Sequence, residues 1–108
     1  MMTKYGTEIS RKMTKSRVDE LINQFYKILP MKENESATLS TYLNSLLREM
    51  LGMKELMTEW HEDGRYISLC GILQGMIDNP DRDVPAVRSD VFKAINMIKL
   101  LQKKYGAS

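Results

Sequence analysis

The sequence predicts an all-α protein, a small four-helix bundle with a long second helix and a mobile basic N-terminal arm. Apolar residues recur at steps of three and four through most of the chain, and short polar linkers separate these runs. Apolar residues make up 43% and charged residues 28%, a composition typical of globular proteins. A chain of 108 residues can close one core, so we expect a flexible arm over residues 1–15 and a single domain over residues 16–108.

The first 15 residues have no sustained apolar period and are rich in threonine, serine and lysine, which indicates a mobile arm. We expect the first helix to begin at Ser16, a typical N-cap residue, with Asp19 three positions further on. Its apolar positions are Val18, Leu21, Ile22, Phe25, Ile28 and Leu29. Pro30 is expected to end this helix because proline lacks the N–H that a helix interior needs.

A second stripe predicts the longest helix, from Ala37 to near Glu62. Its members follow alternating steps of four and three: Leu39, Leu43, Leu46, Met50, Met53, Met57 and Trp60. Gly52 is the weakest point of this helix because glycine lowers helix stability.

Further apolar residues flank this stripe and exceed what a narrow packing seam requires. Methionine is flexible and serves adaptable binding surfaces, and the chain contains nine. We therefore expect a surface for protein interaction formed by Tyr42, Leu47, Met50, Leu51, Met53, Leu56, Met57 and Trp60. In the alternative interpretation, the methionines fill the core around the large Trp60 ring.

His61 is the only histidine and is followed by Glu62, Asp63 and Gly64. We expect this stretch to be the last turn of the long helix, with Gly64 as its left-handed cap. A zinc-protease helix needs a second histidine four positions after the first, but position 65 is arginine. Adjacent helical residues point in different directions, so His61 and Glu62 are not expected to form an acid–base pair.

A third helix is expected over residues 65–78 and should be the most buried one, because apolar residues occupy most of its sides. These residues are Tyr66, Ile67, Leu69, Cys70, Ile72, Leu73, Met76 and Ile77. Ser68, Gly71 and Gly75 form a strip of small residues on which we expect another helix to pack closely. A ligand groove is the alternative interpretation of this strip.

A fourth helix is expected after an acidic loop, with Asp83 as its cap and Pro85 in its first turn. Its apolar positions are Val87, Val91, Ala94, Ile98, Leu101 and Tyr105. Three lysines gather near its C-terminal end, where cations interact favourably with the helix dipole, and Gly106 is expected to cap it.

The net charge of +2 conceals a segregation along the chain. Residues 1–32 carry seven Lys and Arg against three Asp and Glu, residues 33–90 carry five against eleven, and residues 91–108 carry four against none. If the basic ends lie together, they form a nucleic-acid surface from Lys4, Arg11, Lys12, Lys15, Arg17, Lys99, Lys103 and Lys104. The acidic centre and the lack of a recognition helix argue against this function.

The sequence predicts no catalytic, cofactor or metal site, since no serine elbow, phosphate loop or supported cysteine–histidine pair occurs. The lone Cys70 cannot form a disulfide within one chain. We therefore expect a non-enzymatic regulatory or adaptor protein that binds another protein, in the simplest case as a homodimer. A nucleic-acid-binding regulator that uses its basic termini is the alternative. With no membrane-spanning run or signal peptide in the sequence, we expect no membrane partner and a cytoplasmic location.

Overall fold

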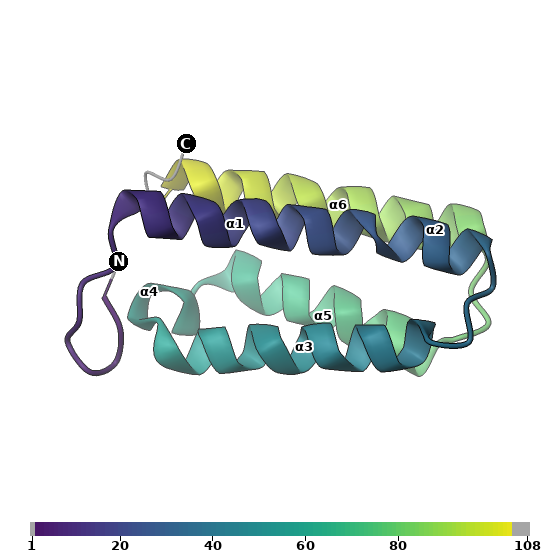
Figure 1. Ribbon diagram of the computed structural model, residues 1–108, viewed down its shortest axis with the longest axis horizontal. Coiled ribbons are helices and arrows are strands. Elements are labelled where there is room, and N and C mark those ends of the chain that lie inside the picture. The colour runs from purple at the N-terminus through teal and green to yellow at the C-terminus, as the bar shows by residue number, and fades with distance from the viewer. Residues whose placement is uncertain (1, 105–108) are drawn as a thin grey trace.

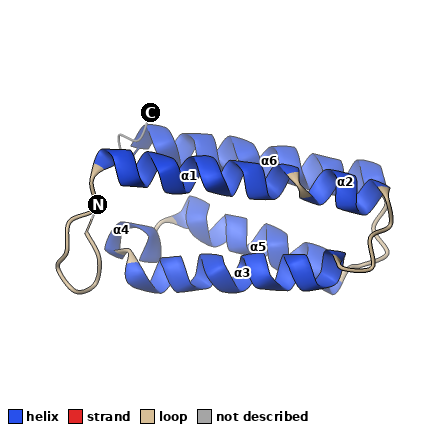
Figure 2. Ribbon diagram, viewed as in Figure 1, coloured by secondary structure: helices blue, strands red, loops and turns tan. Residues whose placement is uncertain are grey.

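The computed structural model describes residues 2–104, except the side chain of Arg11. Six helical segments make up most of this part: α1 (Arg11–Tyr26), α2 (Ile28–Glu33), α3 (Leu39–Leu56), α4 (Thr58–His61), α5 (Gly64–Asp78) and α6 (Val84–Lys104). The predicted all-α fold is confirmed, because the described elements are all helices (Figure 2).

The helices form two layers (Figure 1). In one layer α1 and α2 lie beside α6, and in the other α3 lies beside α5. The layers are joined mainly where α5 packs against α6. The backbones of α1 and α3 stay farther apart than those of the other neighbouring long helices, and this leaves one side of the bundle more open. The start of α1 and the end of α6 lie at the same end of the molecule, which extends 42 Å along its longest axis.

The core lies between the layers and takes side chains from all the long helices. The largest buried side chains are Trp60, Tyr66, Phe25, Ile28, Met50, Leu69, Leu73, Ile95, Ile98 and Leu101. The Trp60 ring stacks on Tyr66 with a centroid distance of 5.0 Å, and the Tyr66 hydroxyl donates to the carbonyl oxygen of Met50 at 2.7 Å. Burial raises the pKa of this hydroxyl, so it stays protonated and holds α5 against α3.

The first helix begins earlier than predicted. Ser10 caps it, and not Ser16, because the Ser10 Oγ accepts a hydrogen bond from the N–H of Met13 at 3.2 Å. Thr14 is buried, and its hydroxyl donates to the carbonyl oxygen of Ser10 at 3.0 Å. Residues 11–15, which the sequence places in the arm, therefore belong to α1.

Pro30 does not end the first helix but interrupts it one turn earlier. It cannot donate a hydrogen bond to the carbonyl of Tyr26, and its ring crowds that carbonyl. The helix accordingly ends at Tyr26, and α2 resumes at Ile28 with Pro30 as its third residue.

The long second helix is also interrupted, which the sequence did not predict. Met57 has an extended backbone, with φ −96° and ψ 115°, and separates α3 from α4. Gly52, the predicted weak point, stays helical. Periodicity cannot reveal this break because Met57 and Trp60 keep the helical spacing on both sides of it.

Gly64 begins α5 and does not end the preceding helix, so its predicted role as a left-handed cap is wrong. Asp63 caps α5 instead. Its Oδ1 accepts hydrogen bonds from the N–H groups of Arg65 at 2.8 Å and Tyr66 at 3.3 Å. An aspartate before a glycine favours this arrangement, since aspartate is among the preferred N-cap residues.

Helix α5 is buried on one side only, although the sequence predicts burial on most sides. Ile67 is 48% exposed, and Ile72 is only partly buried. No helix packs closely on the strip of small residues, because a Cβ added at Gly71 or Gly75 would meet no atom within 4 Å. The prediction of close helix packing on this strip is therefore wrong.

The predicted start and apolar face of the last helix are confirmed. Asp83 accepts a hydrogen bond from the N–H of Ala86 at 3.0 Å, and Pro85 lies in the first turn. The predicted apolar residues Val87, Val91, Ala94, Ile98 and Leu101 are all buried. Tyr105 and Gly106 lie outside the described residues.

The turn that follows α2 contains Glu35, which has a positive φ of 51° although it is not a glycine. Its N–H donates to the carbonyl of Lys32 at 3.2 Å, and the N–H of Ser36 donates to that of Met31 at 2.9 Å, the Schellman pattern. Glycine adopts this conformation without the cost of about 1 kcal/mol that other residues incur. We expect Glu35→Gly to raise the free energy of unfolding by about 1 kcal/mol, measured by thermal denaturation.

Glu35→Ala is the matched control, because it removes the same side-chain atoms beyond Cβ but keeps the backbone cost. We expect its melting temperature to stay near that of the wild type. An equal gain in both variants would show that the glutamate side chain, and not its backbone conformation, limits stability.

Candidate functional site

Among the cavities that the described residues form, two lie at different ends of the bundle. The larger, about 580 Å³, lies where the α2–α3 and α5–α6 connections meet. The smaller, about 410 Å³, lies between α1 and the α3–α4 junction, near the start of α1. We call them the end cavity and the methionine groove.

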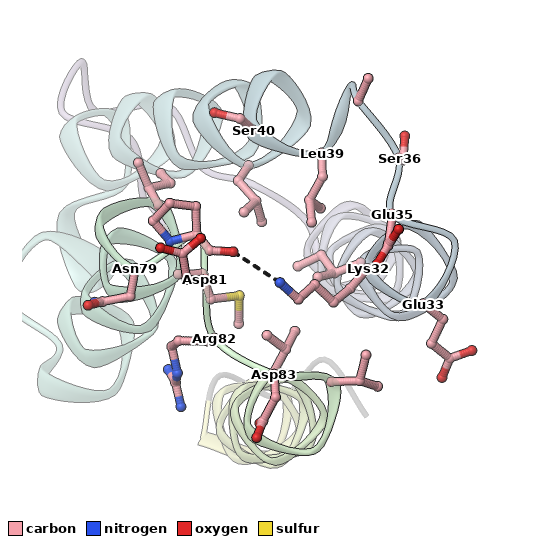
Figure 3. A pocket seen from close by; sticks show the side chains of 18 residues that line it. Lys32, Glu33, Glu35, Ser36, Leu39, Ser40, Asn79, Asp81, Arg82 and Asp83 are labelled. Carbon is pink, nitrogen blue, oxygen red and sulfur yellow. Dashed lines mark hydrogen bonds between the residues drawn. The ribbon is translucent and has the colours of Figure 1, made fainter.

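The end cavity has an apolar floor and a charged rim (Figure 3). Across its mouth the Lys32 ammonium donates to the carbonyl oxygen of Pro80 at 3.1 Å. Arg82 forms an ion pair with Asp90, and the rim residue Glu33 is paired with a second arginine at 3.1 Å. The cationic groups of this rim thus already have partners within the protein. The sequence did not predict this cavity because two connections more than 40 residues apart build it.

The methionine groove lies where the α1 and α3 backbones stay apart. Its lining residues are Ile9, Met13, Thr14, Ser16, Arg17, Glu20, Met53, Leu56, Met57 and Trp60. Met13 is 60% exposed and stands at the mouth, whereas Met57 and Trp60 are 3% and 1% exposed and form the base. The groove is therefore an apolar recess that opens to solvent along α1.

Polar side chains bridge α1 and α3 beside the groove. Arg17 lies 3.4 Å from Glu20 and 3.6 Å from Glu49. The Gln24 amide donates to Glu49 at 3.3 Å, and the Tyr42 hydroxyl donates to the backbone carbonyl of Gln24 at 2.7 Å. Burial, together with the charge of Glu49, raises the pKa of the Tyr42 hydroxyl. Exposed ion pairs of this kind contribute at most about 1 kcal/mol each, so they define the edge of the groove more than they stabilise the fold.

The indole N–H of Trp60 is buried and has no acceptor among the described residues. A buried donor without a partner costs about 1–3 kcal/mol, and few are left so in native proteins. The ring itself is held by its stacking on Tyr66. The Trp60 ring borders the methionine groove, but its N–H is itself closed off from solvent.

The N-terminal segment, residues 2–9, adjoins the groove and contributes Ile9 to its lining. Thr3 pairs with Met57 in an isolated bridge. The N–H of Lys4 donates to the carbonyl of Leu56 at 2.7 Å, and the N–H of Thr58 donates to that of Met2 at 3.0 Å. These bonds use backbone groups that a continuous helix would pair internally, and they account for the break at Met57.

The expected mobile arm is therefore not confirmed for residues 2–15. Thr3 is 7% exposed, and the following turn is closed by a hydrogen bond from its N–H to the carbonyl of Thr7 at 2.8 Å. Lys4 and Tyr5 remain exposed within this segment.

The residues predicted for protein interaction do not form one exposed surface. Leu47, Met50, Met57 and Trp60 are buried, while Tyr42, Met53 and Leu56 are partly buried and Leu51 is 45% exposed. The core interpretation of the methionine stripe is thus correct for Met50 and Met57. Four of the eight, Met53, Leu56, Met57 and Trp60, meet at the groove. Met13 was missed because the sequence prediction started the first helix after it, and its signal was the cap at Ser10.

The eight basic residues predicted as a nucleic-acid surface are divided among several places. Lys12, Lys15, Lys99 and Lys103 are exposed on α1 and α6. Lys4 lies in the N-terminal segment, Arg17 faces α3, and Lys104 lies 2.9 Å from the buried carboxylate of Asp63. The side chain of Arg11 is outside the described residues.

No arrangement for metal binding occurs among the described residues, in which no group of three His, Cys, Asp or Glu side chains is suitably placed. His61 is exposed at the end of α4. Burial raises the pKa of the Cys70 thiol, so it stays protonated at neutral pH. None of the helices described is both long and apolar enough to cross a bilayer.

Deletion of residues 1–8 tests the structural role of the N-terminal segment. We expect the free energy of unfolding to fall by about 1–3 kcal/mol, because the partners of Leu56 and Thr58 are lost and Met57 becomes exposed. The Trp60 emission should shift to longer wavelength as water reaches the groove. Thermal denaturation and fluorescence measure both effects. Tyr5→Ala, at a 76% exposed position of the same segment, is the control and should change neither. An unchanged melting temperature in the deletion variant would show that this segment is dispensable for folding, as expected for a mobile arm.

The comparisons with known proteins leave this site to be interpreted from its geometry. No protein-family model matches the chain, and no curated protein or solved structure matches it either.

Proposed function

We propose that this protein is a non-enzymatic regulator or adaptor whose methionine groove binds an apolar side chain of a partner protein. The observation that supports the proposal is a recess of about 410 Å³ with methionine walls and the Trp60 ring at its base. Methionine side chains adapt to different apolar shapes, and tryptophan is enriched among residues that contribute most to binding.

The shape of the groove favours a short anchor over a long helix interface. The Arg17–Glu49 pair bounds it toward the middle of the bundle, and Ile9 of the N-terminal segment contributes to its wall. One large apolar side chain of the partner fits between these limits. This is the anchor-in-groove mode of peptide recognition.

Peptide selection on the immobilised protein tests this function. A displayed library of helical peptides should yield binders that carry a large apolar residue. Met13→Glu should weaken these binders about tenfold or more, because it places a charge at the mouth of the groove. Met13 is 60% exposed, so the variant should keep its fold.

Leu100→Glu is the matched control, with a 48% exposed apolar residue replaced on α6, away from the groove. It should leave peptide binding unchanged. A library without binders, or binders that tolerate Met13→Glu, would count against the proposed function.

The homodimer expected from the sequence remains a prediction. Its test should use apolar residues that the structure leaves exposed. Leu51 and Ile67, 45% and 48% exposed, are the large apolar residues left on the paired helices α3 and α5. A two-fold contact is the commonest way for a small domain to cover such residues. Light scattering after size exclusion should show twice the monomer mass of 12.5 kDa at high concentration.

Leu51→Glu should then restore the monomer without unfolding it. Leu47→Glu is unsuitable for this test because Leu47, although expected on the interaction surface from the sequence, is buried in the core. A monomer mass at all concentrations up to about 100 µM would contradict the dimer.

The nucleic-acid alternative also stays a prediction, with a smaller footprint. Of its eight residues, Lys12, Lys15, Lys99 and Lys103 are exposed on α1 and α6, and Lys4 is exposed in the N-terminal segment. Arg17 and Lys104 form ion pairs within the protein, and the side chain of Arg11 lies outside the described residues.

A further inference from the structure

Charge separates between the two layers of the bundle. Residues 11–33 and 84–104, which form the α1–α6 layer, contain eleven Lys and Arg against four Asp and Glu, a net charge of +7. Residues 39–78, which form the other layer, contain three against six, a net charge of −3. The small net charge of the chain thus hides one strongly positive side, which attracts anionic partners.

Three contacts fix the register of the antiparallel helices on this side. The Gln102 amide donates to Asp19 at 2.8 Å, the Tyr26 and Phe92 rings meet edge to face at 6.3 Å, and an α2–α6 ion pair of 3.1 Å follows further along. Helical spacing then places Lys15, one turn before Asp19, beside this row of contacts.

The four exposed lysines lie near the end of this row at which Gln102 contacts Asp19. Lys99 stands one turn before Gln102, and Lys103 lies one turn beyond Lys99. Lys12 precedes Lys15 by one turn on α1. All four lysines are exposed, and they have no opposite charge within the salt-bridge distance among the described residues.

Large apolar side chains are also exposed on these two helices. Tyr26 is 42% exposed, Phe92 is 45% exposed and Leu100 is 48% exposed. Phe92 and Leu100 are eight residues apart, so they lie two turns from each other on the outer side of α6. Single exposed apolar residues are ordinary, but exposed lysines together with exposed large apolar residues on one pair of helices match the composition of surfaces that lie on membranes.

We propose that the outer face of α1 and α6 binds the surface of a bilayer that contains anionic lipids. Lys12, Lys15, Lys99 and Lys103 face the lipid phosphates, and Phe92 and Leu100 enter the headgroup region. Such binding needs no membrane-spanning helix. The sequence led us to expect no membrane partner because it contains no membrane-spanning run, but binding at the bilayer surface does not require one.

Leu100 favours a lipid surface over a nucleic acid as the partner of this face. An exposed aromatic ring can stack on a base, but Leu100 cannot, whereas both kinds of side chain gain from leaving water at a lipid interface. The proposal does not depend on the methionine groove, which opens between α1 and α3 and not between α1 and α6.

Vesicle sedimentation with the full chain tests this proposal. Vesicles of phosphatidylcholine with about 30% phosphatidylglycerol should bind the protein in 0.1 M NaCl and bind it less in 0.5 M NaCl, because salt screens the lysines. Vesicles of phosphatidylcholine alone should bind little. The double variant Lys99→Glu/Lys103→Glu should lose about tenfold or more in partitioning to the anionic vesicles.

Arg48→Glu/Arg65→Glu is the charge-matched control, since both arginines are exposed on α3 and α5 and the change in net charge is identical. It should bind vesicles within about twofold of the wild type. Phe92→Ser/Leu100→Ser, at exposed positions, should reduce binding about fivefold or more while the melting temperature stays near that of the wild type.

Three results would overturn the proposal. The first is equal partitioning of the lysine and arginine double variants, and the second is no partitioning of the wild type to anionic vesicles. A third is salt-dependent binding of a single-stranded oligothymidylate that the lysine variant abolishes while vesicles stay unbound, which would assign the face to nucleic acid.

Discussion

The pairing of Met57 with Thr3 determines much of what is distinctive in this bundle. A helix from α3 through α4 without interruption would use the backbone groups of Leu56 and Thr58 internally. These groups instead form hydrogen bonds with the backbone of the N-terminal segment, and the chain turns at Met57 before it reaches Trp60. Trp60 is thereby brought onto Tyr66, and Tyr66 in turn is bonded to α3. A contact that spans more than 50 residues thus positions the base of the groove.

The open side between α1 and α3 complements this arrangement. In a bundle with four equally close sides, the apolar residues of both helices would interlock and leave no recess. Here Arg17, Gln24 and Glu49 span the gap with long polar side chains. Helix α1 therefore borders the groove on one flank and the basic face on the other, so that the two proposed contacts are compatible in one molecule.

Local patterns in the sequence predicted most of the helical structure but not its interruptions. Asp83 and the apolar positions after it were predicted correctly because capping and periodicity act over one or two turns. The break at Met57 depends on residues near the N-terminus, which no local pattern reports. Gly64 was misread because a glycine after a helix also suits the start of the next one when an aspartate precedes it.

The candidate site was predicted only in part, for a related reason. The methionine stripe identified Met53 and Met57. Some members of the stripe lie in the core and others line the groove, and which of the two applies depends on the helix that packs against each residue. Likewise, the sequence showed basic ends, but only the antiparallel pairing of α1 with α6 brings Lys15 and Lys99 to one side.

The position of Cys70 gives this protein an internal measure of how often its layers separate. Its thiol lies almost buried on α5, which packs against both α3 and α6, and burial raises its pKa. A reagent that needs the thiolate can react only during transient opening of these contacts. The modification rate of this single thiol therefore reports the opening of α5, and its dependence on reagent concentration separates the opening rate from the opening equilibrium.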